Sequence, residues 1–232
     1  MVPKMKYLIV IFCLQVTLSN SQNNMQLVVR PKWENQPMVF DSIYQLSTEN
    51  QISFDVLKFY ISKITLLHDD DLVYSEPNSF HLVDASKPES FSMSFPIPEF
   101  QKINKINFIL GIDSITNVSG AMGGDLDPML GMYWTWQSGY INAKIEGTCS
   151  QCETRKNAFI FHLGGYKQPF DSFQNISLKI QNVSQSIVID FDLSTWIKNI
   201  NLSVQNNIMS PSENAVKLSK SLAENFKINR SE

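Results

Sequence analysis

The chain contains 232 residues and carries 19 Lys and Arg against 22 Asp and Glu, a formal net charge of −3. This mild acidity, without a basic cluster, argues against binding to nucleic acid or to an anionic membrane surface. The sequence holds no P-loop, GxGxxG, GxSxG or HExxH pattern, so it points to none of the enzyme classes that these motifs mark.

The first residues have the layout of a secretory signal peptide. Lys4 and Lys6 precede an apolar run, Tyr7–Leu14, and Ser19–Ser21 supplies small or polar residues for cleavage. The apolar run is well short of the roughly 20 residues that a membrane-spanning helix needs. We therefore expect a signal peptide over residues 1–21 and a single periplasmic or secreted domain over residues 22–232.

Short β-strands separated by polar or Gly/Pro turns dominate the rest of the chain. The strongest signal is Ile52–Leu67, in which apolar residues alternate and β-branched and aromatic residues are common. This rhythm is typical of a sandwich or barrel, and we expect a mainly β fold, an antiparallel β-sandwich. The predicted strands, in chain order, are Gln26–Arg30, Ile52–Leu67, Leu72–Tyr74, Phe80–Val83, Ser90–Phe95, Lys105–Leu110, Gly139–Glu146, Ala158–Leu163, Ile176–Ile180 and Ser186–Asp192.

Three segments depart from the strand rhythm. Gly111–Ser138 is rich in glycine and too long for an ordinary hairpin connection, and long loops of this kind tend to carry function. Leu193–Asn199 is predicted to form a short helix. Glu213–Phe226 has helical apolar spacing after a Ser-Pro-Ser opening, which predicts a C-terminal amphipathic helix.

Cys149 and Cys152 are the two cysteines that remain after the signal peptide is removed. They form a C-x-x-C motif, but Glu153 follows it instead of the histidine that covalent haem attachment requires. In an oxidising compartment a disulfide at the tip of a hairpin is the first interpretation. A thiolate clip that holds a metal is the alternative.

Three histidines also remain: His68, His81 and His162. His162 ends an apolar strand that runs into Gly164 and Gly165, and His81 lies inside a predicted strand. Histidine is the commonest metal ligand, although a lone histidine is more often structural. His162 and His81 are therefore the candidate ligands.

The glycine-rich segment and its flank concentrate methionine and aromatic residues. Thioether and imidazole donors together suit copper better than magnesium or calcium, whereas a hydrophobic core cluster is the plainer explanation. Asp113, Asp125 and Asp127 lack the acidic ladder of an EF-hand. The methionine and aromatic residues are Met122, Met129, Met132, Tyr133, Trp134, Trp136 and Tyr140.

Several motifs together resemble the MbnP-like family of periplasmic copper-binding proteins. The most unusual are Gly124–Pro128 (GDLDP) and Gly131–Tyr140 (GMYWTWQSGY). The others are Leu57–Ser62, His81–Asp84, Leu110–Ser114, Phe161–Gly165 and Asn225–Phe226. The resemblance extends over nearly all of the chain after the signal peptide.

This resemblance implies an extracytoplasmic copper binder that is not an enzyme. In such proteins a di-haem cytochrome c peroxidase-like partner can oxidise a tryptophan to kynurenine, which then helps histidines to hold copper. Matched by motif, Trp134 or Trp136 is the residue to be modified, His162 is a ligand and His81 is a weaker candidate. Met132 is a candidate ligand because its thioether is a donor that suits copper.

A carbohydrate-binding or adhesive β-sandwich stays open as the alternative function. Such a module would use exposed Trp134, Trp136 and Tyr140 as stacking platforms.

Overall fold

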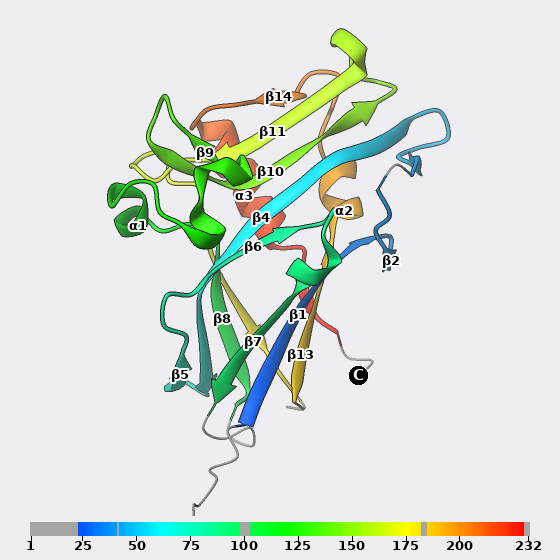
Figure 1. Cartoon of the computed structure of the whole chain (residues 1–232). Coiled ribbons are helices and arrows are strands. Elements are labelled where there is room, and N and C mark those ends of the chain that lie inside the picture. The colour runs from blue at the N-terminus through cyan, green and yellow to red at the C-terminus, as the bar shows by residue number, and fades with distance from the viewer. Residues whose placement is uncertain (1–22, 41, 98–102, 182–184, 230–232) are drawn as a thin grey trace, which may run out of the picture.

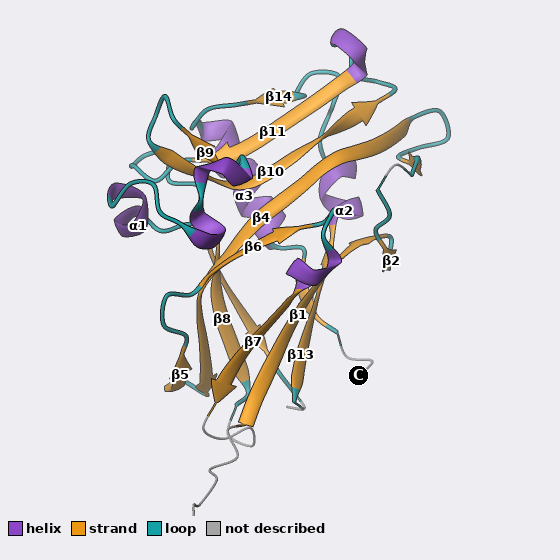
Figure 2. Ribbon diagram, viewed as in Figure 1, coloured by secondary structure: helices purple, strands orange, loops and turns teal. Residues whose placement is uncertain are grey.

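The protein folds into two β-sheets with helices at their margins (Figure 1 and Figure 2). The computed structural model describes residues 23–40, 42–97, 103–181 and 185–229, so the predicted signal peptide lies outside the described residues. The strands are β1 Asn23–Trp33, β2 Gln36–Pro37, β3 Tyr44–Gln45, β4 Gln51–His68, β5 Asp71–Ser75, β6 Phe80–Asp84, β7 Ser92–Ile97, β8 Lys105–Leu110, β9 Tyr133–Trp134, β10 Gly139–Cys149, β11 Ala158–Gly164, β12 Gln174–Lys179, β13 Ser186–Asp192, β14 Asn207–Ile208 and β15 Phe226–Ile228.

The larger sheet has ten strands in the order β12-β8-β4-β10-β11-β14, with β3, β5, β6 and β9 paired beside this path. Its axis is β4, whose 18 residues pair with β10 along the first half and with β8 along the second. The register shifts between Ser62 and Thr65, where Lys63 adopts a φ of 54°. An irregularity of this kind bends a strand, which allows β4 to belong to both halves of the molecule (Figure 1).

The smaller sheet has five strands, β15-β13-β1-β2 with β7 on β1. The mainly β, sandwich-like prediction is confirmed, but the sheets are mixed. β1 and β13 pair in parallel, from Gln26 opposite Ser186 to Lys32 opposite Asp192. β11 and β14 also pair in parallel.

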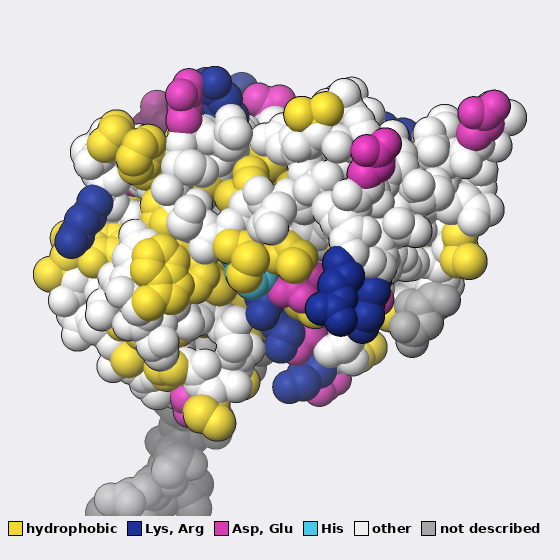
Figure 3. Space-filling view, turned by 90° about the horizontal axis from the view of Figure 1, so that it is seen from above, with side chains coloured by type: hydrophobic (Ala, Val, Ile, Leu, Met, Phe, Trp, Pro, Cys, Tyr) yellow, Lys and Arg dark blue, Asp and Glu magenta, His cyan; other side chains and the backbone are white. Residues whose placement is uncertain are grey.

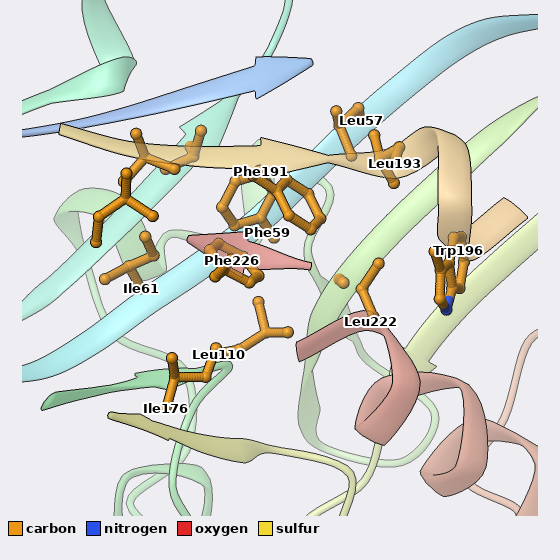
Figure 4. Packing of buried hydrophobic residues seen from close by; sticks show 14 of the residues in the cluster. Leu57, Phe59, Ile61, Leu110, Ile176, Phe191, Leu193, Trp196, Leu222 and Phe226 are labelled. Atoms are coloured by element: carbon orange, nitrogen blue, oxygen red, sulfur yellow. The ribbon is translucent and has the colours of Figure 1, made fainter. Parts of the chain in front are cut away.

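The main hydrophobic core lies between the two sheets and takes side chains from both. At its centre Phe59 of β4, Phe191 of β13 and Phe226 of β15 pack together, and the rings of Phe191 and Phe226 stack with centroids 4.2 Å apart. Leu222 and Trp196 close the same core from the two longer helices (Figure 4). The alternating apolar residues of β4 thus point into a shared interior.

The three α-helices are α1 Ser114–Val118, α2 Leu193–Lys198 and α3 Glu213–Ala223. The Ser212 hydroxyl accepts a hydrogen bond from the Ala215 amide, so the predicted N-terminal cap of α3 is present. α3 ends at Ala223, before the predicted Phe226, because Phe226 enters β15 and pairs with Phe191. None of the helices in the described part of the chain has the length and apolarity that a membrane crossing requires.

The glycine-rich segment is a folded cover and not an open loop. It contains α1, two 3₁₀ turns, η3 Gly124–Leu126 and η4 Pro128–Leu130, and the short strand β9. Its apolar side chains form a second hydrophobic cluster with the outer face of the large sheet, made of Tyr60, Leu82, Ile112, Leu126, Met132, Trp134, Tyr140 and Ile141.

Candidate metal centre

His162 lies on β11 and forms a close pair with a carboxylate of the neighbouring strand. Its Nε2 is 2.6 Å from Oε1 of Glu146 on β10, and only 10% of the imidazole side chain is exposed. The hydrogen bond with His162, assisted by the charge of Lys144, lowers the pKa of Glu146 although burial opposes the change. The carboxylate is therefore held in its charged form beside the ring.

A row of charged residues crosses the sheet at this level. Asp84 of β6, Lys58 of β4, Lys144 of β10 and His162 of β11 are successive partners in register. Partners in register share one face of a sheet, so these side chains and that of Glu146, two residues along β10, lie together. We call these five residues the charged row.

The charged row is internally paired. Nζ of Lys58 is 3.0 Å from Oδ2 of the buried Asp84, and Nζ of Lys144 is 3.4 Å from Oε1 of Glu146. Burial alone would raise the pKa of Asp84, but hydrogen bonds from Ser86 and Lys58 outweigh it and lower that pKa. With two lysines and two carboxylates, the row is close to neutral when His162 is uncharged.

The glycine-rich segment covers the charged row. Both lysines donate long hydrogen bonds to its carbonyl oxygens, Lys58 to Leu130 and Lys144 to Gly131, each at 3.4 Å. The space-filling view from above shows a histidine beside acidic and basic side chains, bordered by hydrophobic side chains (Figure 3).

Trp134 lies on the same face as His162. A Cβ added to Gly164 would be 2.6 Å from Cζ3 of Trp134, so the indole rests directly on the strand that carries His162 two residues earlier. Alternate residues of a strand share a face, which places His162 and Gly164 on the side of the indole. The fold thus places Trp134, a predicted site residue, against the strand that carries the predicted ligand His162.

The other predicted residues of the tryptophan block have different environments. Trp136 is 66% exposed and contacts Trp134, with ring centroids 5.7 Å apart. Met132 is completely buried in the second hydrophobic cluster.

His81 does not join His162. It pairs in register with Ile61, three residues along β4 from Lys58, so it projects from the opposite face of the sheet. Its Nε2 is 2.8 Å from Oε2 of Glu76. A single ion held by both histidines is not compatible with this arrangement.

The predicted disulfide is present. Cys149 and Cys152 are bonded at the tip of the β10–β11 hairpin, and both are buried. The thiolate clip is excluded in this state because both sulfur atoms form the S–S bond.

The three aspartates of the glycine-rich region build turns. Asp113 caps α1 and pairs with Lys63, and Asp127 caps η4. Oδ2 of Asp125 accepts a hydrogen bond from the Leu82 amide, which ties the cover to β6.

The sequence analysis did not predict the charged residues beside His162. Glu146 and Lys144 alternate with Ala143 and Ile145 inside a predicted strand, and this alternation was the available signal. Within the described residues, no group of three or more His, Cys, Asp or Glu side chains is placed to hold a metal ion. The titratable side chain nearest the predicted ligand His162 is the carboxylate of Glu146, which was not among the predicted site residues.

Fold and site define a two-sheet β domain in which a histidine–carboxylate pair lies beneath a tryptophan-bearing cover. The MbnP family model matches residues 22–210, and the chain belongs to the MbnP family. Among solved structures, MbnP from Methylosinus trichosporium aligns with a TM-score of 0.54 at 11% identity, covering 78% of this chain and 79% of that one. This likeness supports the fold. No curated protein matches the sequence significantly.

Proposed function

We propose that this protein is an extracytoplasmic copper binder, not an enzyme, and that His162 is the residue that takes the metal. The MbnP family is associated with copper and with locations outside the cytoplasm. The single observation that carries the assignment to His162 is that it shares a covered face with Trp134, beside a charged carboxylate.

The donor chemistry at this face is compatible with copper. Imidazole nitrogen and carboxylate oxygen are both donors that divalent copper accepts. Histidine ligands are commonly oriented by a carboxylate, and the 2.6 Å contact between His162 and Glu146 supplies such a partner. Bound copper would be held by His162, with Glu146 either orienting the ring or binding directly, and His81 has no part in this site.

Oxidation of Trp134 to kynurenine completes the proposal. The product carries an aryl amine and a ketone, whereas an indole N–H can only donate. Trp134, on the strand of His162, is better placed for this role than the exposed Trp136. The oxidant would be supplied by a di-haem cytochrome c peroxidase-like partner, and Trp136, in contact with Trp134, faces the solvent from which such a partner approaches.

The burial of the aromatic side chains gives the carbohydrate-binding alternative less support than the copper proposal. Of its three aromatic platforms, Trp134 is 7% exposed and Tyr140 is 1% exposed, which leaves Trp136 as the only one of the three open to a sugar ring.

Copper retention by variants tests the proposal. Protein exported by its native host is purified without chelators as wild type, His162→Ala and His81→Ala, and copper is measured per chain. We expect His162→Ala to lose copper, because it removes the imidazole donor, and His81→Ala to keep it. Loss in neither variant, with both folded by circular dichroism, would remove His162 from the site.

A further inference from the structure

A cavity of about 760 Å³ lies on the smaller sheet, where the end of β13 meets α2 (Figure 1). Asp190 and Asp192 of β13 line it, and they alternate with Ile189 and Phe191, whose side chains are completely buried in the main core. The two carboxylates therefore face away from the core. Small-molecule sites commonly have volumes of roughly 300–1,000 Å³, so the cavity has the size of a ligand site. His162 belongs to the larger sheet and does not line it.

The wall of this cavity carries equal numbers of positive and negative side chains: Lys32, Lys198, Lys227, Glu34, Asp190 and Asp192. Nζ of Lys32 is 2.6 Å from Oδ2 of Asp190, and Lys198 pairs with Glu34. Asp192 accepts hydrogen bonds from two backbone amides of the wall. Because the charges balance, the wall favours a ligand without net charge over a strong anion such as phosphate.

Two charged groups of the wall have bonding capacity that the other described residues do not use. Oδ1 of Asp190 is buried and has no hydrogen-bond partner among them, which is a costly state for a charged acceptor. The Asp190 side chain as a whole is 22% exposed, and rotation about its soft χ2 torsion turns this oxygen toward the cavity.

Lys227 is the second such group. It is the register partner of Asp190 in the pairing of β13 with β15, so both side chains lie on the same face. Lys227 is exposed, and its ammonium group forms no ion pair with any residue in the described part of the chain. The cavity thus presents one negative acceptor and one positive donor next to each other.

A second hollow, of about 360 Å³, continues from the cavity between α2 and α3. The two share Thr195, Asn225 and Lys227, so Lys227 stands where they join. The second hollow differs in character because its wall adds the apolar residues Trp196, Ile200 and Leu218. A ligand held by its charges in the first cavity has room for an apolar side chain in the second.

We propose that this cavity binds a small zwitterion, an amino acid or short peptide with an apolar side chain. Its ammonium group binds Asp190, its carboxylate binds Lys227, and its side chain enters the second hollow. Each charge of the ligand then meets a group of opposite sign, and its net charge of zero matches the balanced wall. This site goes beyond the proposed copper function, because none of its residues belongs to the candidate metal centre.

Isothermal titration calorimetry of the full chain tests the proposal with l-leucine, l-phenylalanine and the dipeptide Ala-Leu. Isocaproate and isoamylamine are leucine without its amine and without its carboxylate, so each lacks one of the two charged contacts. We expect at least one zwitterion to bind. We expect isocaproate and isoamylamine to bind about tenfold more weakly than leucine, or less, because a hydrogen bond to a charged group contributes this much.

Three variants locate the site. Asp190→Asn and Lys227→Gln should each weaken zwitterion binding by about tenfold or more. Lys227→Gln should fold normally because Lys227 is exposed and has no ion pair among the described residues, so it keeps the test valid if Asp190→Asn is unstable. Lys220→Gln is the matched control, because Lys220 is also exposed and lies on α3 outside the cavity.

The proposal is overturned if folded wild-type protein binds none of the three zwitterions at concentrations up to about 10 mM. Equal affinity of wild type and Lys227→Gln would also overturn it, since binding would then occur elsewhere. Isocaproate or isoamylamine binding as tightly as leucine would show a site for a single charge and not for a zwitterion.

Discussion

At the scale of single residues, the closest packing at the site involves Gly164. The strand must lack a Cβ there, because that atom would be 2.6 Å from Trp134 Cζ3 and 2.9 Å from the carbonyl oxygen of Tyr140. Glycine at this position is therefore what allows the indole to rest on the strand of His162.

Gly164→Ala is expected to displace the indole and to lower the free energy of unfolding by about 1–3 kcal/mol, the usual cost of overpacking. Urea unfolding followed by tryptophan fluorescence measures both effects. Gly123→Ala is the matched control, because its Cβ meets nothing within 4 Å and its φ is −96°. Equal stability of the two variants would show that the packing of Trp134 on Gly164 is not as tight as described.

Asp84 gives a prediction about pH. Its pKa lies below the ordinary value of 3.8, because hydrogen bonds from Ser86 and Lys58 outweigh the effect of burial. A carboxyl group with a lowered folded-state pKa stabilises the fold above its unfolded-state pKa, and this stability is lost as the pH falls through the folded-state value. Between about pH 5 and pH 3 the wild type should lose more stability than Asp84→Asn. Parallel stability curves from urea titrations at each pH would contradict this assignment.

At the scale of elements, the alternation of apolar and polar residues predicted most of the strands. The remaining strands form only because they pair with distant segments of the chain. β8 and β13 coincide with the predicted ranges, since each carries a strong local pattern. β14 and β15 have two or three residues and exist because they pair with distant strands, so no local signal marks them. The parallel pairing of β1 with β13 joins segments about 160 residues apart, as their register shows. No local sequence pattern predicts a pairing over this distance.

The candidate site, too, could be predicted only in part, because it depends on which strands pair and in which register. His162 could be selected from its own surroundings, but its separation from His81 depends on the register of the two strands between them. A shift of one residue in that register would turn a side chain to the other face. Glu146 became visible as a partner only once β10 and β11 were paired.

The β10–β11 hairpin yields a prediction about the disulfide. Its cysteines are three residues apart, so the closed loop is short and the chain-entropy model gives a stabilisation of about 2 kcal/mol. The double variant Cys149→Ser, Cys152→Ser should lose stability of this order in thermal unfolding but keep its copper, because the sulfur atoms are not ligands. Loss of copper from a folded double variant would restore the thiolate clip.

At the scale of the whole molecule, the two faces of the large sheet contact different parts of the protein. One face completes the core between the sheets, and the other carries the charged row beneath the glycine-rich cover. The cover ends in Trp134 and the exposed Trp136, so the proposed modification would occur where the partly buried charged row meets the surface.

Protein from its native host is therefore expected to carry kynurenine at position 134. The conversion replaces one carbon with one oxygen, a change of about +4 Da that peptide mass spectrometry assigns to a single residue. Trp136 should be unmodified in the same peptide. Copper-containing protein with both tryptophans intact would contradict the kynurenine mechanism and leave copper binding through His162 in place.

The location of the metal is the most direct test of the central claim. Crystals of copper-loaded native protein, measured at the copper absorption edge, would give an anomalous difference peak at each bound ion. We predict a peak in bonding contact with His162, on the face that carries Trp134 and Glu146. A peak at His81 on the opposite face, or none at His162 in protein shown to contain copper, would contradict it.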